Sequence, residues 1–305
     1  MAMFRRMEKP ARAPQDEAPR PATTSAPQSR QPAAEKAEDD IHPPPPVGWS
    51  ETRIAVAERL FGSGLVAPSD PAYMEKLVAP LRLMPGMTVI EIGAGLGGNA
   101  RIVAAKTGAS VIGLESDPIL AQVGMRRSTD AGQAESAPVR PFTPPDLGLD
   151  PGSIDAAYAR QTFFRIAEKE ALYRAIFRAL RTGGDLLFTE LMMVKPQSTN
   201  PDLARWQTAE QATPWTLSQT TSCLGEIGFD VRVTAEVTDE LRRLILGAWA
   251  RFAQDLTGGL DRSTAMNILA EGELWLRRLG LIDSGDLVAY RVLARKGSAG
   301  GESEP

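Results

Sequence analysis

A cluster of glycines between two acidic side chains is the feature of this sequence best suited to bind a ligand. Residues 89–99 read Val-Ile-Glu-Ile-Gly-Ala-Gly-Leu-Gly-Gly-Asn, which predicts a strand, a glycine turn and the start of a helix in succession. Glycine lets the backbone adopt a positive φ and lets a ligand come close to main-chain amides. Gly93, Gly95 and Gly98 also satisfy the dinucleotide pattern G-x-G-x-x-G, so the glycines alone leave the ligand open.

Two carboxylates distinguish between the ligands that such a loop can take. Glu91 stands two residues before the first glycine, where it would repel a diphosphate but attract the ammonium and sulfonium groups of S-adenosylmethionine. Glu115 ends the next predicted strand and can accept hydrogen bonds from both ribose hydroxyls. Its alternative is a local role beside Asp117, the better helix cap. We therefore expect S-adenosylmethionine, with NAD or FAD and a purely structural glycine turn as the alternatives. The residues expected to contact the cofactor are Glu91, Gly93, Ala94, Gly95, Gly97, Glu115, Ser116 and Arg160.

The reacting groups require less machinery than the cofactor does. Methyl transfer from a sulfonium is an in-line displacement, and its barrier falls mainly because donor and acceptor are held at reacting distance. If a general base takes part, Glu190 is the first candidate and Tyr158 the second, although both positions are more often structural. Arg160 and Arg165 could bind an anionic substrate group through forked hydrogen bonds, or form surface salt bridges with glutamates such as Glu168.

Predicted strands and helices alternate along the chain, which indicates an α/β fold with a parallel sheet and helices on both faces. Strands are expected at residues 87–92, 110–115, 138–142, 154–159, 185–190, 229–237 and 286–294. Helices are expected at residues 51–60, 71–81, 99–107, 118–127, 169–181, 217–227, 239–256 and 262–279. The glycines of residues 181–184 should stop the helix that begins at residue 169.

Composition divides the chain into a folded region and two tails. Residues 1–47 are rich in Pro, Ala, Gln and Ser and poor in large apolar side chains, which predicts a disordered tail, one that could bind a protein partner. Residues 297–305 are expected to be a second disordered end. Between them we expect one domain at 48–296, with N-terminal helices at 48–84 and a helical lid at 237–280. The C-terminal half contains Trp206, Trp215, Trp249 and Trp275, which could hold a quaternary ammonium, but ordinary core packing is the simpler interpretation.

Bulk properties exclude several function classes. The formal net charge is −4 and the sequence pI is about 5.3, so nucleic acid is not an expected partner. Cys223 and His42 are the only cysteine and histidine, which excludes an intramolecular disulfide, a His-based hydrolase and a zinc site. No apolar run approaches the length of a membrane span. We expect no metal and a cytoplasmic location.

The sequence resembles class I methyltransferases, which use S-adenosylmethionine. The resemblance rests on residues 91–98, on Glu115, on Gly-Ser-Ile-Asp-Ala-Ala-Tyr at 152–158 and on Ala-Leu-Arg-Thr-Gly-Gly at 179–184. Within this class the chain is similar to phosphoethanolamine N-methyltransferases and related small-amine enzymes, on residues 59–65, 158–166, 169–172 and 228–231. The resemblance implies sheet order 3-2-1-4-5-7-6 with strand 7 antiparallel, the cofactor across strands 1 and 2, and the substrate over strands 4 and 5.

The resemblance also implies substrate contacts, and there the sequence departs from the family. Trp49 and Arg165 occupy the places of a Tyr and a His that close the site in phosphoethanolamine enzymes, and Gln161 replaces an Asp. Leu191 stands where a Tyr contacts the substrate phosphate, and Thr143 stands where an acid lies near adenine. We still expect Trp49, Gln161 and Arg165 to bind substrate and Thr143 to lie at the cofactor, but we do not expect phosphoethanolamine to be the acceptor.

Two functions from different classes remain. The first is methyl transfer from S-adenosylmethionine to a small molecule such as an amine, with little or no help from a general base. The second is a non-catalytic regulatory or scaffold protein that keeps the fold and uses its N-terminal tail to bind a partner. A nicotinamide-dependent oxidoreductase is a distant third.

Overall fold

The computed structural model describes residues 48–297 of the chain. Its strands are β1 Thr88–Ile92, β2 Ser110–Glu115, β3 Val139–Pro141, β4 Ile154–Arg160, β5 Leu180–Met193, β6 Phe229–Glu236 and β7 Leu287–Lys296. Its helices are α1 Glu51–Phe61, α2 Pro71–Val78, α3 Gly98–Thr107, α4 Pro118–Asp130, α5 Lys169–Ala179, α6 Pro201–Glu210, α7 Leu217–Ile227, α8 Thr238–Asp255 and α9 Arg262–Asp283, with short 3-10 turns η1 Ala79–Leu81 and η2 Phe163–Arg165.

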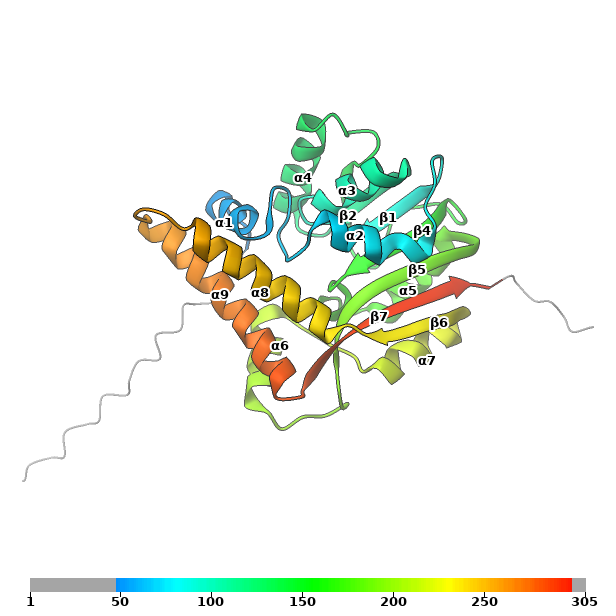
Figure 1. Cartoon of the computed structure of the whole chain (residues 1–305). Coiled ribbons are helices and arrows are strands. Elements are labelled where there is room, and N and C mark those ends of the chain that lie inside the picture. Colours follow the sequence, from blue (N-terminus) through cyan, green and yellow to red (C-terminus); the bar gives the residue numbers. More distant parts are fainter. Residues whose placement is uncertain (1–47, 298–305) are drawn as a thin grey trace, which may run out of the picture. The chain divides into compact units, whose positions relative to one another are not determined.

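The strands form one sheet in the order β3-β2-β1-β4-β5-β7-β6 (Figure 1). Strands β1 to β5 pair with one another in parallel, whereas β7 runs antiparallel to both β5 and β6. This is the predicted order and the predicted orientation of strand 7. Because β1 is flanked by β2 and β4, the chain reverses its direction of winding at β1, and ligands bind in such sheets at the carboxyl ends of the strands on either side of that point.

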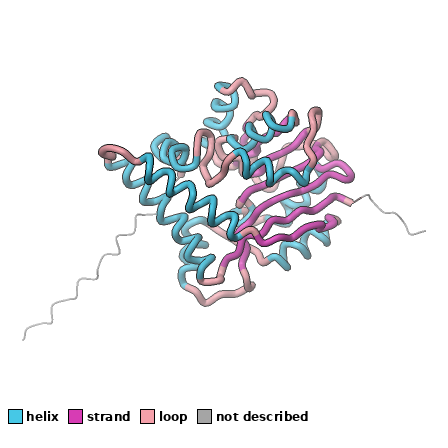
Figure 2. Tube along the Cα trace, in the orientation of Figure 1, coloured by secondary structure: helices cyan, strands magenta, loops and turns pink. Residues whose placement is uncertain are grey.

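Helices cover both faces of the sheet (Figure 2). Alternate residues of β1 belong to different cores: Val89 packs with α2 and α3, while Ile90 and Ile92 pack on the face of α5 and α7. Both sides of the strand are therefore buried, which accounts for the apolar side chains at Val89, Ile90 and Ile92.

A separate helical group lies at the carboxyl edge of the sheet. Its core joins α1, α6, α8 and α9 around side chains that include Phe61, Phe164, Trp206 and Trp275. The α8–α9 hairpin extends from β6 and β7 alongside α1 (Figure 1). The helices expected at 239–256 and 262–279 are thus present, and three tryptophans of the C-terminal half, Trp206, Trp249 and Trp275, pack in or against this core.

Local signals account for most helix boundaries. Asp117 accepts hydrogen bonds from the amides of Ile119 and Leu120 and is followed by Pro118, a favourable first helical residue. Thr216 and Gln219 form a capping box at the start of α7.

Two predicted boundaries were wrong, and one helix was not predicted. The helix expected to end at Arg181 ends at Ala179, and β5 begins at Leu180 with an irregularity opposite β4, so the glycines there belong to a strand and not to a helix stop. The helix expected at 71–81 becomes a 3-10 turn at η1, where Pro80 lies. Helix α6 was not predicted, although Asn200 caps it and Pro201 opens it.

The predicted tail at 1–47 and residues 298–305 lie outside the described residues, and the domain limits stay a prediction, as does the cytoplasmic location. Within residues 48–297, no helix combines the length and apolarity that crossing a bilayer requires.

Candidate active site

A cavity of about 930 Å³ opens at the carboxyl edge of the sheet, around the point where the winding reverses. Its loop side is lined by Val66, Gly93, Gly95, Glu115, Ser116, Asp117, Leu120, Phe142, Pro144, Arg160, Gln161 and Thr162. Its helical side is lined by residues that include Trp49, Arg53, Arg165, Glu168, Glu210, Gln211, Glu271, Glu273, Trp275, Arg277 and Arg278.

Five of the six backbone amides in the glycine loop at residues 93–98 donate hydrogen bonds within the protein. The amides of Gly93, Ala94, Gly95, Gly97 and Gly98 all donate hydrogen bonds of 2.7–3.2 Å within the protein, to Leu114, Glu115, Ala94 and Gly64. Gly93, Gly95 and Gly97 have φ values of 75°, 57° and 73°, a region that favours glycine. A side chain at Gly93 would overlap Thr162, and a Cβ at Gly95 would lie 2.7 Å from Val66. The loop is therefore closely packed, and these five amides are not free to bind a diphosphate.

Glu115 is held in place at the wall of the cavity. One carboxylate oxygen accepts the amide of Gly95 at 2.7 Å and the other accepts the amide of Asp117 at 2.9 Å. Burial raises the pKa of Glu115, and these backbone hydrogen bonds act against that rise. Each oxygen of a carboxylate has more than one acceptor position. Glu115 can therefore accept two further hydroxyl donors from the cavity, as the sequence predicts for a ribose.

Glu91 lies behind the loop and not on the cavity wall. Its carboxylate is 1% exposed and accepts a hydrogen bond from the hydroxyl of Tyr158, 3.2 Å away on the facing strand. Burial raises the pKa of Glu91 to about 7, against the lowering by the charge of Arg160 and by the Tyr158 hydroxyl. The sequence assigned to Glu91 the distinction between a diphosphate and a cationic nucleoside. In the structure, the occupied loop amides and Glu115 bear on that distinction instead.

The other expected cofactor residues divide into two groups. Gly93, Gly95, Ser116 and Arg160 line the cavity, whereas Ala94 and Gly97 support the loop from inside. Thr143 does not line the cavity either, because it pairs with Asp146 in a tight turn. Its neighbours Phe142 and Pro144 line the wall together with Leu120, which makes this part of the loop side apolar. Of residues 142–144, only Thr143 was predicted from the sequence to lie at the cofactor. The apolar residues on either side of it, Phe142 and Pro144, were the signal that could have located this wall.

The helical side contains one carboxylate shared by two guanidinium groups. Glu210 contacts Arg165 at 2.6 Å, Arg278 with its Nε at 2.9 Å, and the indole N–H of Trp206 at 2.7 Å. Burial alone would raise the pKa of Glu210, but the two arginines outweigh it and lower that pKa to about 2. One negative charge therefore faces two positive charges, and this cluster carries a surplus positive charge. Arg165 pairs with Glu210 and not with Glu168.

The N-terminal segment is tied to the same wall. Arg53 donates to Glu271 at 2.9 Å and to the carbonyl of Gly48, and its guanidinium lies 3.9 Å from the ring centroid of Trp49. Arg278 likewise lies 4.4 Å from the ring centroid of Trp275. One face of each tryptophan thus contacts an arginine of the protein itself, which leaves less of the ring available to a quaternary ammonium.

Gln161 lines the cavity at the end of β4. It follows β4 with a φ of 47°, an uncommon conformation for a residue other than glycine, and its amide donates to the carbonyl of Thr189 at 2.6 Å. Backbone strain of this kind concentrates at binding sites. Trp49, Gln161 and Arg165, the three residues expected to bind substrate, all line the cavity.

Neither candidate base reaches the cavity. Tyr158 is fully buried, and burial together with Glu91 raises its pKa well above the ordinary value. The carboxylate of Glu190 is also buried, where it accepts the amides of Phe164 at 3.1 Å and Leu191 at 2.8 Å. The predicted strand ended at Glu190, but β5 continues to Met193, which removes this carboxylate from the strand end. We assign no proton transfer to either residue.

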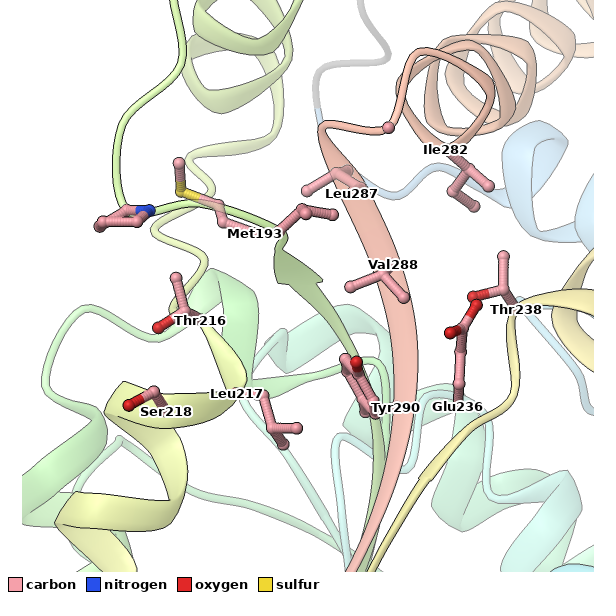
Figure 3. Close-up of a pocket in the computed structure, with 13 residues that line it drawn as sticks. Met193, Thr216, Leu217, Ser218, Glu236, Thr238, Ile282, Leu287, Val288 and Tyr290 are labelled. Atoms are coloured by element: carbon pink, nitrogen blue, oxygen red, sulfur yellow. The ribbon is translucent and has the colours of Figure 1, made fainter.

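A second, smaller cavity of about 490 Å³ lies elsewhere, beside the carboxyl end of β5 and the start of α7 (Figure 3). Met193, Leu217 and Val288 line it with hydroxyls of Thr216 and Tyr290. None of the predicted site residues lines it. Among the described residues no group of three or more His, Cys, Asp or Glu side chains is arranged to hold a metal ion.

Sequence reasoning missed most of the helical side. Glu210, Glu271, Trp275 and Arg278 come from α6 and α9, far along the chain from the loops they face. No local motif marks them. Only the general expectation that residues 237–280 cover the pocket pointed to this region.

Comparison with known proteins places these features in context. The family model described as "Methyltransferase domain" matches residues 90–188. Phosphoethanolamine N-methyltransferase 1 of Zea mays is 29% identical over 147 residues, which are 47% of this chain and 28% of that protein. Sterol 24-C-methyltransferase of Yarrowia lipolytica is 25% identical over 228 residues, covering 68% of this chain and 58% of that protein. The chain thus spans well under two thirds of these curated relatives.

A solved structure has the same fold. Phosphoethanolamine N-methyltransferase 2 of Haemonchus contortus, in complex with S-adenosyl-L-methionine, superposes with a TM-score of 0.73 at 21% identity. The match covers 82% of this chain and 58% of that one.

Proposed function

Because the chain contains a class I methyltransferase domain, we propose that it transfers a methyl group from S-adenosylmethionine to a small-molecule acceptor. The observation that carries the proposal is the state of the loop after β1. Five of its amides are occupied within the protein while Glu115 lines the cavity, a combination that suits a ribose without a diphosphate. The named relatives are methyltransferases, which supports the same reaction type.

The residues of the loop side fit the cofactor. Glu115 would accept the ribose hydroxyls, and Leu120, Phe142 and Pro144 would pack against the adenine, whose faces are apolar. Gly93 and Gly95 allow the chain to come close without a side chain in the way. Glu91 would act from behind the loop, through its charge and its hydrogen bond with Tyr158.

Positioning is sufficient for the chemistry. S-adenosylmethionine supplies a methyl group activated by a positively charged sulfur. The helical side would hold the acceptor so that its lone pair faces the methyl carbon, and Trp49 and Trp275 would exclude water. A neutral amine attacks without prior loss of a proton and can release one to solvent afterwards. This agrees with the absence of Glu190 and Tyr158 from the cavity wall among the residues described.

We propose further that the acceptor has an anionic group. The cluster of Glu210, Arg165 and Arg278 has one positive charge in excess, and the side chain of Arg165 is 46% exposed on the cavity wall. A guanidinium can donate paired hydrogen bonds to a carboxylate or a phosphate. Gln161 lies between this cluster and the glycine loop, where it could orient the reacting atom.

Calorimetry with S-adenosylhomocysteine tests the proposal. Gly95→Ala should weaken binding at least about tenfold, because the new methyl group meets Val66 and the positive φ is strained. Gly148→Ala is the matched control, since Gly148 has a similar φ of 62° but open space around it. Binding by wild type and control but not by Gly95→Ala supports the proposal. No measurable heat with wild type at millimolar ligand would refute it.

Turnover decides between an enzyme and a scaffold. Conversion of S-adenosylmethionine should be followed with small amines that carry a phosphate or carboxylate and with their uncharged analogues. Arg165→Met should lower kcat/KM for the anionic acceptor about tenfold or more and leave the affinity for S-adenosylhomocysteine unchanged. Cofactor binding with no turnover on any acceptor would favour the non-catalytic alternative.

A further inference from the structure

Two buried charged residues lie directly behind the wall that carries Arg165. Glu190 on β5 and Lys169 at the start of α5 are 4% and 2% exposed, and neither lines the cavity. Each of them binds main-chain atoms of the segment between β4 and α5. We propose that Glu190 and Lys169 are positioning residues, which fix the backbone of residues 163–166 so that Arg165 faces the acceptor.

The contacts of Glu190 hold the first half of this segment. Its carboxylate accepts the amide of Phe164 at 3.1 Å, directly before Arg165, and the amide of Leu191 at 2.8 Å. Amides at the start of a short 3-10 turn such as η2 have no partner within the turn, so a buried carboxylate is well suited to satisfy one. The same charge would be costly in the interior without such donors.

The contacts of Lys169 hold the second half and join it to the segment that follows α6. Its ammonium donates to the carbonyl of Ile166 at 2.6 Å and to the carbonyl and hydroxyl of Thr213 at 2.5 and 2.7 Å. Thr213 in turn donates its amide to the carbonyl of Phe164 at 2.6 Å. Thr213 lies three residues after Glu210, the partner of Arg165.

The two buried residues therefore control both members of the Arg165–Glu210 pair. Glu190 fixes the backbone beside Arg165, and Lys169 fixes the backbone after Arg165 and after Glu210. Neither residue contacts the loop side, where Gly95 and Glu115 lie. Loss of either should disturb the acceptor and leave the cofactor in place. This inference rests on the proposed function for its kinetic arm only.

The test compares Glu190→Gln and Lys169→Met with wild type. Glu190→Gln keeps the shape but places an N–H group against one of the two backbone amides. Glu170→Gln is the control. Glu170 follows Lys169 on α5, is exposed and binds Arg174 four residues further along the same helix. Thr213→Val is a milder variant, in case the others fail to fold, because it removes the hydroxyl contacts with Lys169, Phe164 and Ile166 but keeps the backbone contacts.

Hydrogen exchange and kinetics give separate readouts. Exchange of the amides at 163–168 should accelerate about tenfold or more in Glu190→Gln and Lys169→Met, while amides of β1 and β4 keep wild-type rates. KM for the anionic acceptor found by the turnover screen should rise about tenfold, with S-adenosylhomocysteine affinity within about twofold of wild type. Thr213→Val should move both quantities in the same direction by less.

Two outcomes would overturn the inference. One is unchanged exchange at 163–168 in both main variants. The other is a parallel loss of exchange protection in the sheet and of S-adenosylhomocysteine binding, which would show a general structural role. A failure of wild type to bind S-adenosylhomocysteine would refute the proposed function instead, and the exchange measurement would still decide this inference.

Discussion

Glu91 illustrates how burial changes the role of a single acidic residue. The sequence places it correctly, two positions before the first glycine, but the spacing cannot show which side of the loop its carboxylate takes. In the structure it lies against Tyr158, with a pKa raised to about 7 mainly by burial. A half-ionised carboxyl beneath the cofactor loop makes the stability of the fold depend on pH.

The direction of that dependence follows from the two pKa values. Between the ordinary value of 4.5 and about 7, the folded protein holds a proton on Glu91 that the unfolded chain has lost, so the free energy of unfolding falls as the pH rises. Glu91→Gln should remove on the order of 3 kcal/mol of this fall between about pH 4.5 and 7. Urea denaturation at both ends of that range measures it. Burial also raises the pKa of Glu190, but Glu190 is present in both wild type and Glu91→Gln, so its effect on the difference between them cancels. Equal slopes in both proteins would contradict the prediction.

At the scale of elements, the loop side was predictable and the helical side was not. Gly93, Gly95, Glu115 and Ser116 sit where strands end, and strand ends can be located from hydrophobic pattern and turn residues. The pair of Arg53 and Glu271 joins residues 218 positions apart, and nothing local marks either partner. Glu190 was misplaced for a related reason, since an error of three residues at the end of β5 moves a side chain from the edge into the interior.

The contact between α6 and α9 yields a prediction about stability. Glu210→Ala would leave Arg278, whose side chain is 5% exposed, without its carboxylate. Removing one partner of a buried pair costs about 3 kcal/mol or more. Glu170→Ala, which breaks an exposed pair within one helix, should cost about 0.5 kcal/mol. Chemical denaturation at neutral pH compares the two, and similar losses would show that the α6–α9 contact contributes little.

At the scale of the whole molecule, the sheet was predicted most completely. Alternation of strands and helices fixes the class, and the family resemblance supplied the order β3-β2-β1-β4-β5-β7-β6. Helix α6 escaped because its apolar residues are few, although Asn200 and Pro201 marked its start. What remained beyond reach was how the helical group closes over the sheet edge, because that depends on packing between distant segments.

Ligand binding should be visible in the stability of the entire domain. At about a hundred times its dissociation constant, S-adenosylhomocysteine should stabilise the fold by about 2.7 kcal/mol and raise Tm by roughly 5–10 °C. NADH at the same concentration should change Tm by much less, because five of the loop amides are already occupied and cannot donate to its diphosphate. Thermal scans with both ligands make the comparison, and a larger shift with NADH would reverse the assignment of the cofactor.

The position of β7 between β5 and β6 has a consequence for how this protein could be redesigned. Helix α8 follows β6 and helix α9 precedes β7. The α8–α9 segment, which lines part of the helical side of the cavity, is therefore connected at both ends to neighbouring antiparallel strands. Glu236 at the end of β6 pairs with Tyr290 of β7, so the two attachment points of this segment lie side by side. We expect that a hairpin of another length, if it keeps the contacts with α1 and α6, can replace the segment and change which compounds are admitted, while the parallel strands that carry the glycine loop stay as they are.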